Sequence, residues 1–253
     1  MKMQDARSFL KHDGDERHVL NFGGGLNSTA LLVFLLSRNY PLDEVIFADT
    51  GGEVPETYKH LGTIGSYLSQ HDVPFRIVRS ENGALYDFCM RRKLIPSRVW
   101  PWSIRDYKIA PIHAYYRSLN AHVNQYLGIS YEERDRARDS GVQYVTNVFP
   151  LVGSELSRPD CIDVIMLADV DLPMPVRSGC FFCPFNSLSR WKEILEHHEE
   201  LYAQARTLEE NSDNFPNRRL TPLTLRTLQE KIEKNESVSD FNPRKLCSGE
   251  CLI

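Results

Sequence analysis

The segment Asn21–Thr29, with the sequence NFGGGLNST, constrains the fold of this chain more than any other. It follows an apolar pair and precedes an apolar run, Ala30–Leu36. A strand that ends in a glycine turn and opens a helix suits phosphate, because glycine lets the backbone approach an anion and the first helical amides point at it. Ser28 and Thr29 can cap the helix and donate hydroxyl groups to phosphate oxygens. We therefore expect a nucleotide held by its phosphates.

Two common phosphate-binding loops are excluded by single positions. A Walker A loop ends in Gly-Lys-Ser/Thr, and no lysine lies between Lys11 and Lys59. The dinucleotide fingerprint needs a third glycine where this chain has Ser28.

The segment Gly23–Ser28 instead resembles the PP-loop of ATP pyrophosphatases, which is written Ser-Gly-Gly-x-Asp-Ser. Gly23 stands in place of the first serine and Asn27 in place of the aspartate. The resemblance implies that ATP binds here. Because displacement of pyrophosphate depends on charge neutralisation, we also expect a magnesium ion. The phosphates would be held by Gly23, Gly24, Gly25, Asn27, Ser28 and Thr29.

A second loop follows the next predicted strand, Val45–Ala48. Ligands of parallel sheets bind at the carboxyl ends of the strands, so both loops are expected to face one crevice. The sequence Asp49–Gly51 with Pro55–Thr57 resembles the Asp-Thr-Gly…Phe-Pro-Glu-Thr stretch of phosphoadenosine phosphosulfate (PAPS) reductases, which share the PP-loop superfamily. The resemblance implies nucleotide contacts from Asp49, Thr50 and Gly51, with Asp49 as the candidate magnesium contact.

Later motifs resemble a PAPS-reductase-like branch that is common in phage and bacterial DNA-modification gene sets. They are Asp106–Ile112, Tyr144–Leu151, Arg158–Cys161, Ser178–Phe185 and Cys247–Cys251. The resemblance implies sulfur transfer to nucleic acid, as in DNA-phosphorothioation and transfer-RNA thiolation enzymes.

Strand and helix patterns alternate along most of the chain, which predicts an α/β fold with a doubly wound parallel sheet of the adenine nucleotide alpha hydrolase-like type. The predicted strands are 18–22, 44–48, 74–78 and 143–147, and the predicted helices are 28–38, 55–70, 83–92, 106–119 and 159–168. One long helix over 187–210 and a second that starts at Thr221-Pro222 and runs to Lys234 follow. We expect a nucleotide-binding domain over 1–178 and a helical, cysteine-containing extension over 179–253.

Length and composition suit an ordinary folded protein. The chain has 253 residues, of which 42% are hydrophobic, and its apolar runs are shorter than the roughly eighteen residues of a membrane span. Residues 1–16 are polar and lack the apolar stretch of a secretion signal, so we expect a cytoplasmic protein without a membrane partner. In that compartment the six cysteines are thiols, metal ligands or catalytic groups rather than structural disulfides.

Cys180-x-x-Cys183 is a chelating pair that suits zinc, an iron–sulfur cluster or a dithiol couple. The resemblance adds Cys161, whereas a fourth family cysteine is replaced by Ser103. One interpretation is a [4Fe-4S] cluster on Cys161, Cys180 and Cys183 with one open iron. The alternatives are zinc with a fourth ligand such as Cys89 or His113, a dithiol, or buried cysteines without a ligand.

The tail also carries a candidate nucleophile. PAPS reductases carry Glu-Cys-Gly near their end, and Glu250-Cys251 matches its first two residues. The resemblance makes Cys251 a candidate catalytic sulfur carrier.

Cations and aromatic residues alternate between Arg91 and Lys108, although the net charge of the chain is −4. Such a segment can contact phosphates and stack on unpaired bases, or it can be an ordinary basic loop. We expect Arg105 and Lys108 to contact nucleotide phosphates, with Lys108 as a catalytic candidate. The mixed charges of Glu132–Asp139 predict a solvated helix face.

The leading hypothesis is an ATP pyrophosphatase that activates an acceptor, releases pyrophosphate and delivers sulfur to nucleic acid. Its sulfur donor would be a protein such as a cysteine desulfurase. The alternatives are a PAPS or adenylylsulfate reductase, which needs no ATP hydrolysis, and a non-catalytic nucleotide-binding subunit of a DNA-modification complex. The non-catalytic subunit is favoured by Asn27 in place of the loop aspartate.

Overall fold

A single five-stranded parallel sheet forms the centre of the computed structural model, which describes residues 16–98, 100–168, 172–175, 178–212 and 219–238. The strand order is β3-β2-β1-β4-β5, and every neighbouring pair is parallel. The strands are β1 (Glu16–Asn21), β2 (Glu44–Asp49), β3 (Phe75–Arg79), β4 (His122–Leu127) and β5 (Val145–Val148). The predicted doubly wound parallel α/β sheet is confirmed.

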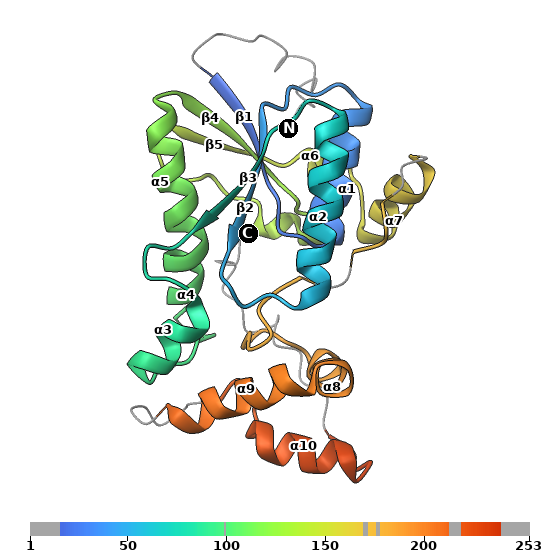
Figure 1. Cartoon of the computed structure of the whole chain (residues 1–253). Coiled ribbons are helices and arrows are strands. Elements are labelled where there is room, and N and C mark those ends of the chain that lie inside the picture. Colours follow the sequence, from blue (N-terminus) through green and yellow to red (C-terminus); the bar gives the residue numbers. More distant parts are fainter. Residues whose placement is uncertain (1–15, 99, 169–171, 176–177, 213–218, 239–253) are drawn as a thin grey trace.

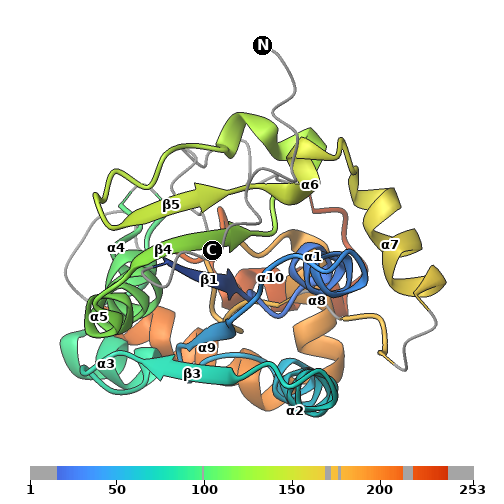
Figure 2. The same cartoon turned by 90° about the horizontal axis from the view of Figure 1, so that it is seen from above.

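Helices cover both faces of this sheet (Figures 1 and 2). One face carries α1 (Leu26–Ser37), α2 (Pro55–Gln70) and α7 (Arg158–Leu167), and the other carries α5 (Ala110–Leu119). The shorter elements are α3 (Leu85–Arg92), α4 (Trp102–Ile104), the π-helix η2 (Arg105–Ile109), the 3₁₀-helix η3 (Tyr131–Arg136) and α6 (Pro150–Gly153). The predicted helix over 106–119 is thus a π-helical turn that continues into α5.

Alternation of side chains along the strands creates two separate apolar layers. Leu20 and Phe47 pack with α1 and α2 in one cluster, whereas Val19 and Ile46 pack with α5 in the other. All four side chains are at most 1% exposed. Central strands of a parallel sheet are buried on both faces, which is why β2 reads as a continuous buried run.

Strand β4 was not among the predicted strands, although it lies beside β1 in the centre of the sheet. Its sequence, HVNQYL, contains polar residues that are buried. The Asn124 amide donates to Glu16, and the Gln125 side chain accepts from Asn21 at 2.6 Å and donates to Asn147 at 2.8 Å. These paired amides satisfy the polar groups that burial would otherwise penalise, so the strand lacks an apolar signature.

The C-terminal extension consists of α8 (Leu188–His197), α9 (Glu199–Asn211) and α10 (Leu225–Glu233), which lie below the sheet in Figure 1. The single long helix expected over 187–210 is interrupted at His198, whose backbone leaves the helical region at φ −143° and ψ 55°. The Thr224 side chain, rather than Thr221, caps α10. Aromatic and aliphatic residues of α3, η2 and the extension share a third apolar cluster. The domain boundary at residue 178 stays a prediction.

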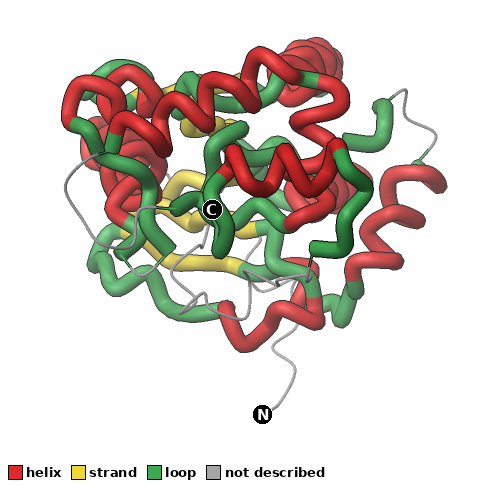
Figure 3. Tube along the Cα trace, turned by 90° about the horizontal axis from the view of Figure 1, so that it is seen from below, coloured by secondary structure: helices red, strands yellow, loops and turns green. Residues whose placement is uncertain are grey.

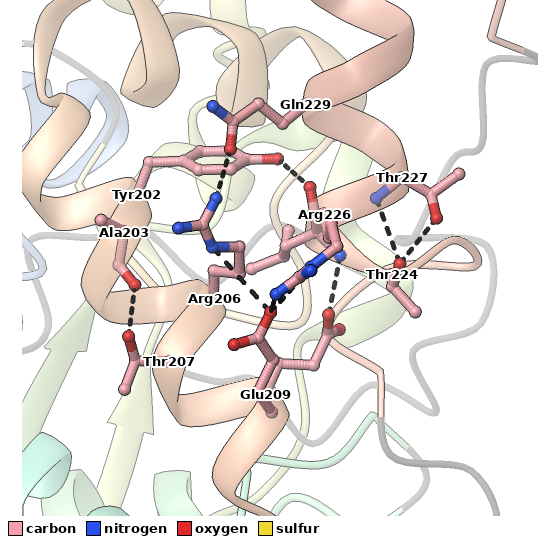
Figure 4. A network of polar contacts seen from close by, with 11 residues as sticks. Tyr202, Ala203, Arg206, Thr207, Glu209, Thr224, Arg226, Thr227 and Gln229 are labelled. Atoms are coloured by element: carbon pink, nitrogen blue, oxygen red, sulfur yellow. Dashed lines mark hydrogen bonds and ion pairs between the residues drawn. The ribbon is translucent and has the colours of Figure 1, made fainter.

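Polar contacts join α9 to α10 (Figure 4). Buried Glu209 accepts hydrogen bonds from the backbone amides of Leu220 and Leu225, at 2.9 and 2.7 Å. The Tyr202 hydroxyl donates to the Leu225 carbonyl, and Arg206 donates to Gln229. These bonds fix the start of α10 against α9, so the extension presents a defined surface to the sheet.

The carboxyl ends of the strands point toward this extension (Figure 1), and Figure 3 views the molecule from that side. The chain leaves β1 toward β2 and β3 on one side and returns through β4 and β5 on the other. The topological switch point therefore lies between β1 and β4, where parallel sheets bind their ligands. Among the helices that the structure describes, none combines the length and apolar character needed to cross a membrane.

Candidate functional site

A cavity of about 480 Å³ opens at the switch point. Its walls come from the loops after β1 and β4, the segment 96–108 and the segment 178–186. Eight of the residues expected in the site line it: Gly23, Gly25, Asn27, Ser28, Thr50, Lys108, Cys180 and Cys183. The structure thus gathers most of the predicted phosphate loop, one predicted cation and two predicted thiols around one space.

The loop after β1 has the conformation that a phosphate site requires. Gly24 has a positive φ of 74°, which a side chain would strain, and Gly25 caps α1. The Ser28 hydroxyl accepts a hydrogen bond from the Gly25 amide at 3.2 Å and donates to the Gly25 carbonyl at 2.9 Å. Gly24 itself is absent from the lining of the cavity, so it shapes the loop rather than facing a ligand.

Thr29 points away from the cavity. Its hydroxyl donates to the Gly25 carbonyl at 3.0 Å and lies 3.1 Å from His60 Nε2, and the residue is fully buried. Burial lowers the pKa of His60. Thr29 therefore supports the loop from beneath, and its expected contact with phosphate stays a prediction.

Gly128 brings the loop after β4 against the start of α1. A side-chain carbon at this glycine would lie 3.0 Å from the backbone nitrogen and Cα of Ser28. A larger residue would crowd the first turn of α1, whose residues Asn27 and Ser28 line the cavity. None of the sequence motifs singles out this residue.

Charged groups in the cavity are mostly positive. The described lining contains the cations Lys108, Arg136 and Arg158 and one carboxylate, Glu133. An excess of cations in a partly enclosed space favours a polyanion such as a nucleotide phosphate. Three of these residues were missed as site residues. Glu133 and Arg136 belong to the run expected to be a solvated helix face, and Arg158 belongs to the Arg-Pro-Asp-Cys motif.

Lys108 and Arg105 lie in the same π-helix but have different surroundings. Lys108 lines the cavity, and its charge counteracts the rise in the pKa of Cys180. Arg105 is exposed and pairs with Asp106 at 2.6 Å, outside the cavity lining. A π-helical turn within a longer helix is frequent at functional sites because it alters which side chains share a face.

The acidic side chain that begins the loop after β2 is fully engaged in contacts within the protein. The Asp49 carboxylate accepts from the Gly51 amide, the Tyr58 hydroxyl and Arg79, all at 2.8–2.9 Å. Asp49 and Gly51 do not line the cavity. The charge of Asp49 is thus paired within the protein, and its expected contact with magnesium or nucleotide stays a prediction.

Cys180 lies beside this loop in a buried polar pocket. Its sulfur is 3.1 Å from the Thr50 hydroxyl and 4.0 Å from the Glu53 carboxylate, which also accepts from the Gly179 amide at 2.8 Å. Burial, and then the charge of Glu53, raise the pKa of the Cys180 thiol well above its usual range. Burial thus favours the neutral thiol of Cys180, whereas Cys183 is partly exposed at the cavity wall.

Cys161 does not join the other two cysteines. It is fully buried among the α1 and α7 side chains, whereas Cys180 belongs to the cluster of α3 and the extension. Burial raises the pKa of Cys161 to about 11. Within the ranges that the structure describes, no three His, Cys, Asp or Glu side chains form a metal-binding group. The described donors therefore do not fit a [4Fe-4S] or zinc centre, and Cys161 is a core residue here.

The basic and aromatic segment is divided between the core and the surface. Trp102 packs against Phe88 and Tyr107, whereas Trp100 is 66% exposed. Ser103 and Ile104 line the cavity just beyond Trp100 in sequence. The segment is therefore one wall of the cavity with an exposed aromatic side chain. Cys251, the predicted sulfur carrier, lies outside the described residues.

Two solved structures have a similar arrangement of elements. A PAPS reductase from Candida auris, in a phosphate complex, has a TM-score of 0.45 and 14% identity over 66% of this chain and 78% of that chain. A U34-tRNA thiolase from Methanococcus maripaludis, with its [4Fe-4S] cluster, has a TM-score of 0.44 and 14% identity over 83% of this chain and 77% of that chain. No protein-family model and no curated protein sequence matches the chain.

Proposed function

We propose that this chain is a PP-loop ATP pyrophosphatase that activates an acceptor for sulfur transfer. The observation that carries the proposal is the shared cavity: a glycine loop at a helix N-terminus, three cations and two thiols surround one space at the switch point of a parallel sheet. The glycine loop supplies amide groups for phosphate, the cations neutralise the phosphate charge, and the thiols offer sulfur chemistry.

The nucleotide would bind with its phosphates at the start of α1. The amides there and Ser28 would hold the pyrophosphate portion, with Lys108, Arg136 and Arg158 nearby. Displacement of pyrophosphate requires mainly alignment and neutralisation of developing negative charge. A magnesium ion on the phosphates would add to that neutralisation.

The reaction would proceed in two displacements. An acceptor oxygen attacks the α-phosphorus of ATP, and pyrophosphate leaves. The outer sulfur of a persulfide, supplied by a donor protein such as a cysteine desulfurase, then replaces that oxygen, which leaves with AMP. A thiol reductant cleaves the remaining S–S bond, so that the sulfur stays on the acceptor and a disulfide forms. Cys183 at the cavity wall is the described thiol best placed to carry the sulfur.

The acceptor is proposed to be nucleic acid, with DNA phosphorothioation as the specific reaction. The support is the wall segment 96–108, which carries exposed Trp100 next to residues that line the cavity. An exposed indole can stack on an unpaired base. The overall charge of −4 gives no general attraction, so contact would be confined to this wall.

A PAPS or adenylylsulfate reductase is the second candidate. It is favoured by two thiols next to one cavity without a third metal donor among the described residues. In that reaction a thiolate attacks the sulfonate sulfur and expels the nucleotide. A second thiol then forms a disulfide and releases sulfite, which balances the two electrons.

Parallel incubations separate the candidates. The protein is given ATP and magnesium with single-stranded DNA or transfer RNA, and separately PAPS or adenylylsulfate with a thiol reductant. Release of pyrophosphate without sulfite supports the proposal, whereas sulfite release supports the reductase. If the protein binds nucleotide but turns it over only when a partner protein is added, the non-catalytic subunit is favoured.

A further inference from the structure

Glu133 is the sole carboxylate among the described residues that line the cavity. It lies on η3, shortly after β4, and thus reaches the site from the strand that neighbours β1. Asp49, the acidic residue expected to contact magnesium, does not line the cavity. A cation on the nucleotide phosphates would therefore meet Glu133 rather than Asp49.

The Asn27 side chain connects this carboxylate to a cation. Its Nδ2 donates to Glu133 Oε2 at 3.2 Å, and its Oδ1 accepts from Arg158 Nη1 at 3.2 Å. A carboxylate only accepts and a guanidinium only donates, so these two partners determine which way the amide faces. Glu133 also pairs with Arg136 in the same 3₁₀-helix.

This geometry explains why position 27 is an asparagine. An aspartate there could still accept from Arg158, but its second oxygen would meet Glu133 at hydrogen-bond distance, and two carboxylates so close repel each other. Position 27 must donate as long as Glu133 is ionised. A single carboxylate near the start of α1 can thus be supplied by residue 27 or by residue 133. In this chain residue 133 is the carboxylate, and residue 27 is a neutral amide.

We propose that Glu133 supplies the carboxylate that holds the magnesium ion of bound ATP, in place of the aspartate of the PP-loop pattern. The proposal rests on the proposed ATP site. Magnesium in nucleotide sites is usually held by one or two carboxylates together with substrate phosphates and water, so a single acidic residue suffices. Asn27 then acts as a positioning residue that orients Glu133 and Arg158.

The test is a charge swap read out by binding. Titration calorimetry measures the dissociation constant of a non-hydrolysable ATP analogue, once with magnesium and once with EDTA. Glu133→Gln is expected to weaken binding at least about tenfold with magnesium, the size of one charge-assisted contact, and to leave binding in EDTA unchanged or tighter. The double variant Asn27→Asp/Glu133→Gln is expected to recover most of the loss, whereas Asn27→Asp alone adds a like charge and does not improve binding.

Asp135→Asn is the matched control, because Asp135 lies on the same 3₁₀-helix, is exposed and does not line the cavity. Bound Mn²⁺, followed by electron paramagnetic resonance in the presence of the analogue, should decrease in Glu133→Gln and return in the swap. Thermal unfolding confirms that each variant is folded.

The outcomes are distinguishable. Wild-type protein that binds no ATP analogue under either condition contradicts the proposed function and this inference with it. Wild-type protein that binds the analogue while Glu133→Gln binds it equally well with magnesium overturns the inference alone. A folded swap variant that is no better than Glu133→Gln also overturns it.

Discussion

The loops after β1 and β2 leave the same edge of the sheet, yet they differ in what their polar groups contact. The loop after β1 faces the cavity with Gly25, Asn27 and Ser28. In the loop after β2, Asp49 is paired with Arg79, and a side-chain carbon at Gly52 would lie 2.8 Å from Phe182. The first loop is arranged for a ligand, and the second joins the sheet to the extension.

The difference shows that resemblance to a motif does not fix the role of each residue in it. Both loops resemble nucleotide-site motifs, but the charge of Asp49 is already paired within the protein. Phe181 donates its amide to the Gly52 carbonyl at 2.8 Å, and Cys180 contacts Thr50, so the extension occupies the space beside this loop. Substitutions in the two loops should therefore change different properties.

The largest effect is expected from Lys108→Ala. Loss of a cation from the cavity should weaken binding of an ATP analogue by about 10- to 100-fold, which is typical for a hydrogen bond to a charged group. Titration calorimetry measures the change. Arg105→Ala is the control, because Arg105 is exposed and paired with Asp106. Equal losses from the two variants would refute the distinction between them.

Gly128→Ala should also weaken binding, by about tenfold, because the added carbon displaces the first turn of α1 and its amides. The control is Gly62→Ala, since nothing lies within 4 Å of a carbon added there. That change should stabilise α2 by about 1 kcal/mol and leave binding intact. Unchanged binding in Gly128→Ala would show that α1 does not hold the ligand.

Asp49→Asn should reduce stability rather than binding. The change removes the charge that accepts from Arg79, Tyr58 and the Gly51 amide, at a cost of about 1–3 kcal/mol in the free energy of unfolding. Urea denaturation measures this cost, with exposed Glu81→Gln as the control. A stable Asp49→Asn variant that no longer binds the nucleotide would reverse the roles of the two loops.

Cys161→Ala should cost about 1–2 kcal/mol of stability through a small cavity in the α1–α7 core, without changing metal content or nucleotide binding. Elemental analysis of anaerobically purified protein is the measurement. Cys183→Ala, at the cavity wall, is the comparison. Iron or zinc that is present in the wild type and lost in Cys161→Ala would contradict this prediction and support a metal site that includes Cys161.

The smallest effect concerns pH. Burial lowers the pKa of His60 from its ordinary value of 6.5, so folding favours the neutral ring. Its contribution to stability is present above pH 6.5 and decreases as the pH falls below it, by less than about 1.4 kcal/mol per pH unit. Urea denaturation between pH 7 and 5 should therefore show a steeper loss in the wild type than in His60→Gln. Parallel curves would contradict this assignment.

Most of the fold followed from local pattern. Glycine turns, apolar runs and helix lengths predicted β1, β2, α1 and α2 to within a few residues. Strand β4 was missed because its buried polar side chains are satisfied by partners on other strands, which a local pattern does not reveal. The interruption at His198 likewise has no glycine or proline to mark it.

The site was less predictable than the fold. Residues next to a glycine turn, such as Ser28, follow directly from the strand–turn–helix unit. Glu133 and Arg158 reach the cavity only because β4 returns beside β1 and α7 packs on α1. Their sequence context, a charged run and a helix start, gives no hint of Asn27 as the partner.

The most direct test of the central claim is a crystal structure of the protein with α,β-methylene-ATP and magnesium. The account predicts the triphosphate at the start of α1, within hydrogen-bond distance of the Ser28 backbone amide and next to Lys108. Triphosphate bound beside Asp49, with the loop after β1 empty, would contradict it.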